Sequence, residues 1–147
     1  MVLVTLSASF SLALAGETLD QIRERDKVRC GVSPVHIKDP AGVGQDRSGL
    51  DRLTCMIYSA AVLGDAKKVE FVPVSAKMRF KALQRKDYDV LIRGTTWTLK
   101  RDAALGLHFA GINFYDGQGF IARKTLGLGS INDVKNASIC VERDTTT

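Results

Sequence analysis

A chain of 147 residues with 45% hydrophobic and 25% charged residues has the composition of a globular domain, which excludes a disordered chain. Its formal net charge is +5, but Lys and Arg are scattered among Asp and Glu rather than gathered in one run. Because phosphate binding needs several cations on one surface, this charge does not predict a nucleic-acid partner.

The first fifteen residues, MVLVTLSASFSLALA, are uncharged and mostly apolar, and they end in the A-x-A pattern Ala13-Leu14-Ala15. This pattern predicts a signal peptide over residues 1–15 and export to the periplasm. The basic residues that usually open such a signal are missing, so a buried N-terminal strand or helix is the alternative. No later segment of the sequence is long and apolar enough to cross a membrane.

Export would place Cys30, Cys55 and Cys140 in an oxidising compartment, where thiols tend to pair. Three cysteines cannot all pair with one another. No C-x-x-C occurs, and His36 and His108 are isolated in the sequence. The spacing therefore predicts no metal site, and nothing in the chain calls for a cofactor.

Helical spacing and β-branched runs alternate after residue 16. They predict, in chain order, a helix at Thr18–Arg25, a strand at Val28–Val32, a loop at Ser33–Ser48, a helix up to Gly64, a strand at Val69–Val74, a helix after Ser75 and a strand at Tyr88–Ile92. Helical crossovers between apolar strands predict an α/β fold with a mainly parallel sheet flanked by helices.

The second helix has the most detailed pattern. Ser48 and Asp51 predict a capping pair at its start, and Gly64 predicts its end. Four apolar residues repeat at helical spacing: Leu50, Leu53, Ile57 and Ala61. In the third helix Ser75 is expected as the cap, with Phe80 and Leu83 turned inward.

The last third of the chain is predicted as shorter elements. They are a polar turn at Gly94–Thr98, a short helix at Leu99–Leu105, a strand at Ala110–Tyr115, extended chain at Phe120–Arg123, a weak helix near Ile131 and a strand at Ala137–Val141. The glycines of Asp116–Gly119 fit a hinge or a tight turn equally well. Because the sequence stops where the next helix is due, the second unit is expected to be truncated.

The polar turn Gly94–Thr98 carries the chemistry, because open α/β sheets bind ligands at the carboxyl ends of their strands. Thr98 is suited to cap the following helix, and Arg101 in its first turn to donate two hydrogen bonds to a carboxylate. Thr95 and Thr96 add hydroxyl donors. The residues predict a carboxylate cradle that needs no nucleophile, base or metal, while a capped surface helix with a solvated Arg is the alternative.

Four stretches of the chain resemble the general L-amino-acid-binding subgroup of solute-binding protein family 3. They are ETLDQIRERDKVRCGV (Glu17–Val32), AAVLGDAKKVEFVPVSAKMRFKALQ (Ala60–Gln84), RGTTWTLKRDAALGLHFAGINFYDGQGF (Arg93–Phe120) and CVERDTTT (Cys140–Thr147). The resemblance covers less than half of a full family member and implies its N-terminal part. It implies a periplasmic binding protein type II lobe at 16–115, followed by a hinge and the start of a truncated second lobe at 116–147.

The resemblance also implies site residues. In the family the residues matching Thr96 and Arg101 contact the ligand α-carboxylate, assisted by the backbone at the position of Gly94. The ligand-binding set implied for this chain is Gly94, Thr95, Thr96, Arg101, Thr145 and Thr146. Trp97 belongs to the same motif and is expected to pack beneath the loop.

A disulfide between Cys30 and Cys55 is implied by the same resemblance, and it leaves Cys140 without a partner. The chain departs from the family pattern in four places. One is the helix entry, where the family has GFDVDYC and Gly49–Cys55 reads GLDRLTC, so that Arg52 and Leu53 break the pattern. The family has a polar residue at the position of Gly94, and it has Gly where Asp144 would bring a negative charge beside the ligand. Its aromatic loop after the first strand is replaced here by a segment in which His36 is the candidate cover.

The resemblance implies the monomeric, non-catalytic receptor of an amino-acid ABC importer, which captures an L-amino acid between two closing lobes and docks on the permease. The family's partner for the ligand α-amino group lies farther along, so only the carboxylate half of the site is expected here. The alternatives are a non-functional remnant, a periplasmic dehydratase-like enzyme using His108, or a sensor or adhesion module that contacts other proteins.

Overall fold

The computed structural model describes residues 16–34 and 47–146. The predicted signal peptide, His36 and most of the loop predicted for Ser33–Ser48 lie outside these ranges. The elements are α1 (Glu17–Arg25), β1 (Val28–Val32), α2 (Arg47–Leu63), β2 (Val69–Pro73), α3 (Arg79–Gln84), β3 (Val90–Leu91), α4 (Leu99–Ala104) and two 3-10 turns at Lys124–Leu126 and Ile131–Asp133. None of the helices in the described ranges has the length and apolar character that crossing a bilayer requires.

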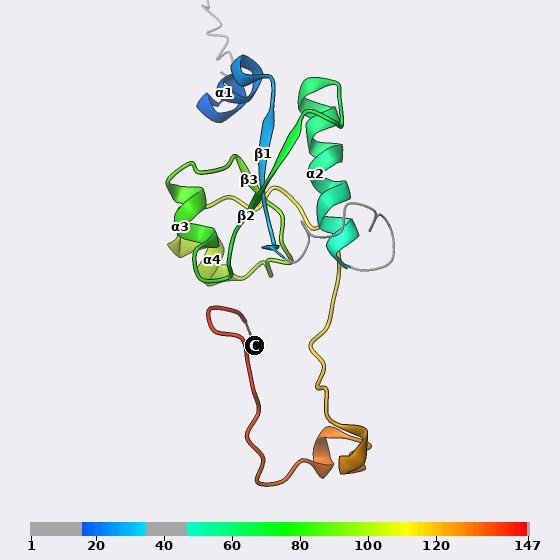
Figure 1. Ribbon diagram of the computed structural model, residues 1–147. Coiled ribbons are helices and arrows are strands. Elements are labelled where there is room, and N and C mark those ends of the chain that lie inside the picture. The colour runs from blue at the N-terminus through cyan, green and yellow to red at the C-terminus, as the bar shows by residue number, and fades with distance from the viewer. Residues whose placement is uncertain (1–15, 35–46, 147) are drawn as a thin grey trace, which may run out of the picture.

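The three strands form a parallel sheet in the order β2-β1-β3. β1 is the central strand, and its Cys30 lies beside Phe71 of β2 and Val90 of β3. α2 packs against β1 and β2 on one face, while α3 packs against β3 on the other, with α4 beside it (Figure 1). This arrangement confirms the predicted α/β fold, because each parallel connection returns through a helix that covers the sheet.

The core follows the two-residue period of β1. Val28, Cys30 and Val32 have no exposed surface and point to one face, where Cys55 of α2 meets them. Gly31 points to the opposite face, where the ring of Tyr88 approaches so closely that a Cβ would lie 2.6 Å from it. The sheet is therefore packed on both faces, as a parallel sheet between helices requires.

The disulfide between Cys30 and Cys55 is present, as the resemblance implied. Their Cα atoms are 6.1 Å apart, and neither residue has exposed surface. The bond joins the central strand to α2 and closes a separation of 25 residues. In the chain-entropy picture such a link stabilises the fold by roughly 3 kcal/mol. Cys140 is a free, exposed thiol.

The predicted inward face of α2 is wrong. Leu53 and Ile57 are 43% and 59% exposed, whereas Asp51, Cys55 and Ser59 are buried. The disulfide turns the Cys55 side of the helix toward β1, and the apolar residues offset from it point to solvent. The backbone of Ser48 lies within α2. Its side chain lies outside the described part of the structure, so the predicted capping pair with Asp51 stays a prediction.

Two predicted helix ends are confirmed. Gly64 ends α2 in the left-handed region at φ 72°, and its amide donates to the carbonyl of Ala60 at 2.9 Å. The predicted cap at Ser75 is different: Met78 occupies the cap position of α3, and the Ser75 hydroxyl accepts from the amide of Met78 in the turn before the helix. Thr98 caps α4, since its hydroxyl accepts from the amide of Arg101 at 3.2 Å.

The strands predicted at Ala110–Tyr115 and Ala137–Val141 do not form, and Phe120–Arg123 pairs with no described strand. Beyond residue 111 the chain runs away from the sheet, turns through the two 3-10 segments and returns below the strands (Figure 1). A strand needs a neighbour for its backbone groups, and in the described ranges this segment has none. The helix expected near Ile131 is the single turn Ile131–Asp133, closed by a capping box with Ser130.

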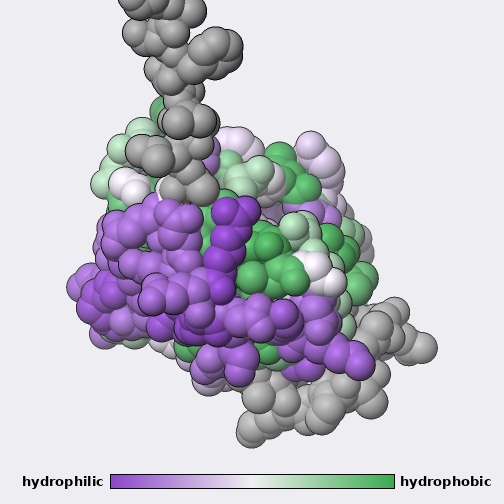
Figure 2. All heavy atoms as spheres, turned by 90° about the horizontal axis from the view of Figure 1, so that it is seen from above, coloured by the Kyte–Doolittle hydropathy of each residue, from purple (hydrophilic) through white to green (hydrophobic). Residues whose placement is uncertain are grey.

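Several ion pairs lie at the end of the sheet that carries α1. The Asp89 carboxylate accepts from the amide of Arg29 at 2.7 Å and pairs with Arg25. Lys86 pairs with Glu17 at 2.9 Å. Figure 2, seen from this end, shows hydrophilic side chains gathered over one part of the surface, with hydrophobic side chains beside them. Cations here lie beside carboxylates, in keeping with the mixed charge of the sequence.

Candidate functional site

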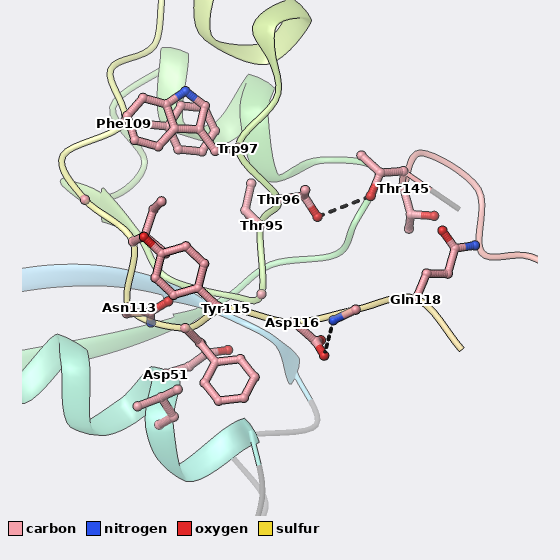
Figure 3. Close-up of a pocket in the computed structure, with 17 residues that line it drawn as sticks. Asp51, Thr95, Thr96, Trp97, Phe109, Asn113, Tyr115, Asp116, Gln118 and Thr145 are labelled. Atoms are coloured by element: carbon pink, nitrogen blue, oxygen red, sulfur yellow. Dashed lines mark hydrogen bonds between the residues drawn. The ribbon is translucent and has the colours of Figure 1, made fainter. Parts of the chain in front are cut away.

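A hollow of about 540 Å³ opens at the carboxyl ends of β1 and β3 (Figure 3). We call it the main hollow. Its walls come from the first turns of α2, the loop after β3, the segment after α4 and the C-terminal loop: Leu50, Asp51, Gly94–Trp97, Phe109, Gly111–Gln118, Thr145 and Thr146. β1 connects to β2 on one side of it, and β2 connects back past β1 to β3 on the other side. The strand order therefore reverses at β1, and ligands of open α/β sheets bind at such a reversal.

Five of the six predicted site residues line the main hollow: Gly94, Thr95, Thr96, Thr145 and Thr146. They belong to two segments about fifty residues apart in sequence, and the fold brings them together. The hydroxyl oxygens of Thr96 and Thr146 are 3.2 Å apart. The sequence motif and the C-terminal turn therefore form one continuous polar wall.

Gly94 begins this wall with φ 52°, in the left-handed region. A side chain is disfavoured there, which explains a glycine where the family has a polar residue. Thr95 follows, and its hydroxyl is buried without a hydrogen-bond partner in the part of the chain that the structure describes. A buried hydroxyl in this state needs a partner that the described residues do not supply.

Arg101 is the predicted site residue that does not line the main hollow. Its Nη1 donates to the carbonyl of Thr96 at 2.9 Å, and its guanidinium carbon lies 5.1 Å from the ring centre of Phe80. The residue is 8% exposed, and this burial lowers its pKa. Arg101 thus lies behind the threonine loop and fixes it, instead of presenting two donors to the hollow.

Three guanidinium groups gather behind this loop. Burial, together with the charges of Arg101 and Arg93, lowers the pKa of Arg79 to about 10. Arg79 and Arg101 lie over Phe80, with Arg79 4.7 Å from its ring centre. The cluster creates a positive potential behind the wall and so favours an anion in the hollow.

The sequence did not single out Arg79, which reads as one more charged residue of a helix. It is 3% exposed, and its Nη2 donates to the carbonyl of Asp144 at 2.8 Å. Asp144 has φ 62° and turns the C-terminal loop toward the sheet. The one sign in the sequence that this position is special was that the family has Gly where this chain has Asp144.

Aromatic rings form a further wall. Trp97 stacks on Phe109 with ring centres 5.2 Å apart and planes within 4°. Its indole N–H donates to Asp102 at 3.1 Å, and the residue is 46% exposed. Trp97 therefore packs against the loop as expected and also borders the hollow, where a ligand can change its environment (Figure 3).

Two carboxylates lining the hollow were missed as site residues. Asp51 is 2% exposed and projects from the first turns of α2 (Figure 3). Asp116 accepts from the amide of Gly117 at 2.8 Å. An acidic residue in the helix after the first strand is a usable signal, since that helix begins at the ligand-binding edge. Asp116 could not be placed because the strand predicted before it does not form.

A second hollow of about 480 Å³ lies between β3 and the segment 107–113. Its lining is largely apolar and includes Phe80, Leu91 and Ile92. His108, the candidate acid or base of the enzyme alternative, lines this second hollow and not the main one. The second hollow shares Gly94 and Thr95 with the main one.

Comparison with known proteins gives consistent relatives. The chain is 42% identical over 148 residues to the glutamate/glutamine/aspartate/asparagine-binding protein BztA of Rhodobacter capsulatus, covering 98% of this chain and 43% of the relative. It is 42% identical over 137 residues to the general L-amino acid-binding periplasmic protein AapJ of Rhizobium johnstonii, covering 92% of this chain and 40% of that protein. No family model matches the chain.

Among solved structures, an ABC transporter/periplasmic binding protein from Brucella ovis with glutathione bound superposes with a TM-score of 0.77. It is 42% identical in sequence, and the match covers 90% of this chain and 42% of that one. The chain spans less than half the length of the curated relatives it matches.

Proposed function

Since the chain is related over most of its length to the amino-acid-binding proteins of ABC transporters, we propose that it binds an L-amino acid without catalysis, as the receptor component of an importer. The observation that carries the proposal is the polar wall at the carboxyl end of the sheet, where Thr96 and Thr146 meet in front of a cluster of arginines.

The wall suits a carboxylate. Thr95 and Thr96 supply hydroxyl donors, and Gly94 permits close approach to the backbone. Arg101 supports Thr96 from behind and contributes its charge to the field in the hollow. Direct contact between Arg101 and the ligand remains a prediction from the family resemblance, and it requires the guanidinium to turn from the Thr96 carbonyl.

The acidic residues suit the other end of an amino acid. Asp51 and Asp116 line the hollow on the side away from the threonines (Figure 3). A carboxylate near a ligand ammonium gives a charge-assisted hydrogen bond, which is about twice as strong as a neutral one. These residues extend the site beyond the carboxylate half that the resemblance implied.

The remaining parts of the proposal follow the family. Residues 16–115 form the first lobe, 116–147 include the hinge and the start of the second, and residues 1–15 direct export to the periplasm. The buried disulfide suits an oxidising compartment. The ligand-bound protein acts as a monomer and docks on a membrane permease.

Trp97 makes the proposal testable, because it is the one tryptophan in the chain and borders the hollow. Titration with L-glutamate, L-glutamine, glycine and glutathione should change its fluorescence, with matching heat in calorimetry. The Thr96→Val variant should lose roughly tenfold in affinity for every amino acid that binds. Thr125→Val, an exposed position outside the hollow, is the matched control.

The outcomes separate the alternatives. If glutathione binds and the amino acids do not, the ligand is the one bound to the Brucella ovis relative rather than a free amino acid. A folded chain that binds none of these ligands at millimolar concentration would contradict the receptor proposal and favour the remnant.

A further inference from the structure

Arg79 has contacts that the proposed binding function does not use. It stands at the first position of α3 and is 3% exposed. Its Nη1 donates to the carbonyl of Ala76 at 2.9 Å, and its Nη2 donates to the carbonyl of Asp144, 65 residues away, at 2.8 Å. The side chain therefore links the sheet-bearing lobe directly to the C-terminal loop.

This charge is not held by an ion pair in the described part of the chain. Arg101 and Arg93 repel it, and Glu142 and Asp144 attract it less strongly. A buried guanidinium in such surroundings is stabilised by its hydrogen bonds and by the ring of Phe80. Its two carbonyl contacts fix the direction in which it reaches.

The acceptor in the longer contact, the Asp144 carbonyl, belongs to the C-terminal loop that forms part of the main hollow. Asp144 adopts φ 62°, and the next two residues, Thr145 and Thr146, line the hollow. The segment before them runs far from the sheet and returns only at this point (Figure 1). A donor that fixes the Asp144 carbonyl therefore fixes where the two threonines stand.

We propose that Arg79 is a positioning residue of the ligand site, which holds the Asp144–Thr146 loop against the Thr95–Thr96 loop without touching the ligand. The part that concerns the ligand rests on the proposed function, and the part that concerns the loop does not.

The chain offers a probe for loop position. Trp97 is the single tryptophan, and Cys140 is the one cysteine outside the disulfide, four residues before Asp144. A dansyl acceptor on Cys140 allows energy transfer from Trp97 to be measured without ligand. In Arg79→Gln the transfer efficiency should fall, and the affinity for L-glutamate or L-glutamine should fall roughly tenfold. Arg23→Gln, which removes an exposed charge on α1, is the matched control and should change neither.

Unchanged energy transfer in a folded Arg79→Gln variant would overturn the proposal, whatever happens to affinity. If transfer falls but even the unaltered chain binds no amino acid, the positioning role stands and the proposed function fails. Far-UV circular dichroism and the intact disulfide show that the lobe is folded in each case.

A second variant keeps the test open if Arg79→Gln does not fold. Proline cannot adopt φ 62°, so Asp144→Pro displaces the carbonyl that accepts from Arg79. This substitution lies outside the core of the lobe. It should lower the energy transfer as Arg79→Gln does. A folded Asp144→Pro protein with unchanged transfer would count against the proposal.

Discussion

At the scale of single residues, Gly31 shows how closely the two faces of the sheet are packed. A Cβ at this position would lie 2.6 to 2.9 Å from three atoms of the Tyr88 ring. Tyr88 is 1% exposed, and its hydroxyl donates to the carbonyl of Arg79, so the ring has little room to move. The absence of a side chain at Gly31 is therefore a packing requirement of the β1–β3 region.

We expect Gly31→Ala to lower the free energy of unfolding by about 1 to 3 kcal/mol, because overpacking forces the ring or the strand to shift. Urea unfolding followed by circular dichroism measures the change. Gly119→Ala is the matched control, since a Cβ there meets nothing within 4 Å. Equal stability of the two variants would show that the ring adjusts freely.

Tyr88 also predicts a dependence of stability on pH. Burial, together with the charge of Asp87, raises its pKa to about 12. Its pKa in the unfolded chain is about 10. Since the folded pKa is the higher one, the stabilisation is complete below pH 10 and is lost as the pH rises toward 12.

The difference in unfolding free energy between the unaltered chain and Tyr88→Phe should therefore shrink between about pH 10 and 12. Comparing the two proteins removes the contributions of other groups that titrate in this range, such as Arg79. A difference that stays constant across this range would contradict the raised pKa.

At the scale of elements, α2 shows a covalent bond overriding hydrophobic periodicity. The sequence favoured a face of Leu53 and Ile57, but Cys55 is bonded to Cys30 on the central strand. The helix is held with Asp51, Cys55 and Ser59 toward the sheet. The Ser59 hydroxyl donates to the carbonyl of Asp65 at 2.8 Å, which satisfies a polar group on the buried face.

Loss of this disulfide should cost roughly 3 kcal/mol of unfolding free energy. The double variant Cys30→Ala/Cys55→Ala should melt at a lower temperature than the oxidised chain, and dithiothreitol should lower the melting temperature of the unaltered chain alone. If dithiothreitol lowered the melting temperature of the double variant by a similar amount, the effect would not come from the disulfide.

At the scale of the whole molecule, the lobe and the following segment differ in burial. Residues 16–34 and 47–110 supply the buried core, while residues 111–141 are exposed apart from a half-buried Val134. Tyr115, Phe120 and Ile121 are 85%, 58% and 101% exposed. Exposed apolar side chains of this kind mark a surface that another part of the chain or a partner protein can cover.

An apolar dye such as anilinonaphthalene sulfonate should accordingly bind the folded chain through this segment. Phe120→Ser/Ile121→Ser should reduce dye fluorescence, whereas Leu99→Ser, at an 83% exposed position on α4, should reduce it much less. Equal reductions would show that dye binding is not specific to the segment.

Sequence patterns were sufficient to predict the helix and strand order up to residue 105, the caps at Thr98 and Gly64, and the polar loop of Gly94–Thr96. These depend on local backbone preferences and on periods of two or 3.6 residues, which adjacent residues encode. The pairing of Cys30 with Cys55 and the site residues followed from family resemblance.

Contacts between distant parts of the chain set four other features: the rotation of α2, the absence of the strands predicted after residue 110, the position of Arg101 behind its loop and the contact between Arg79 and Asp144. Each depends on groups distant in sequence: a bonded cysteine, a strand neighbour, or a carbonyl 65 residues away. Local patterns state which groups need partners, and the fold decides which partners they find.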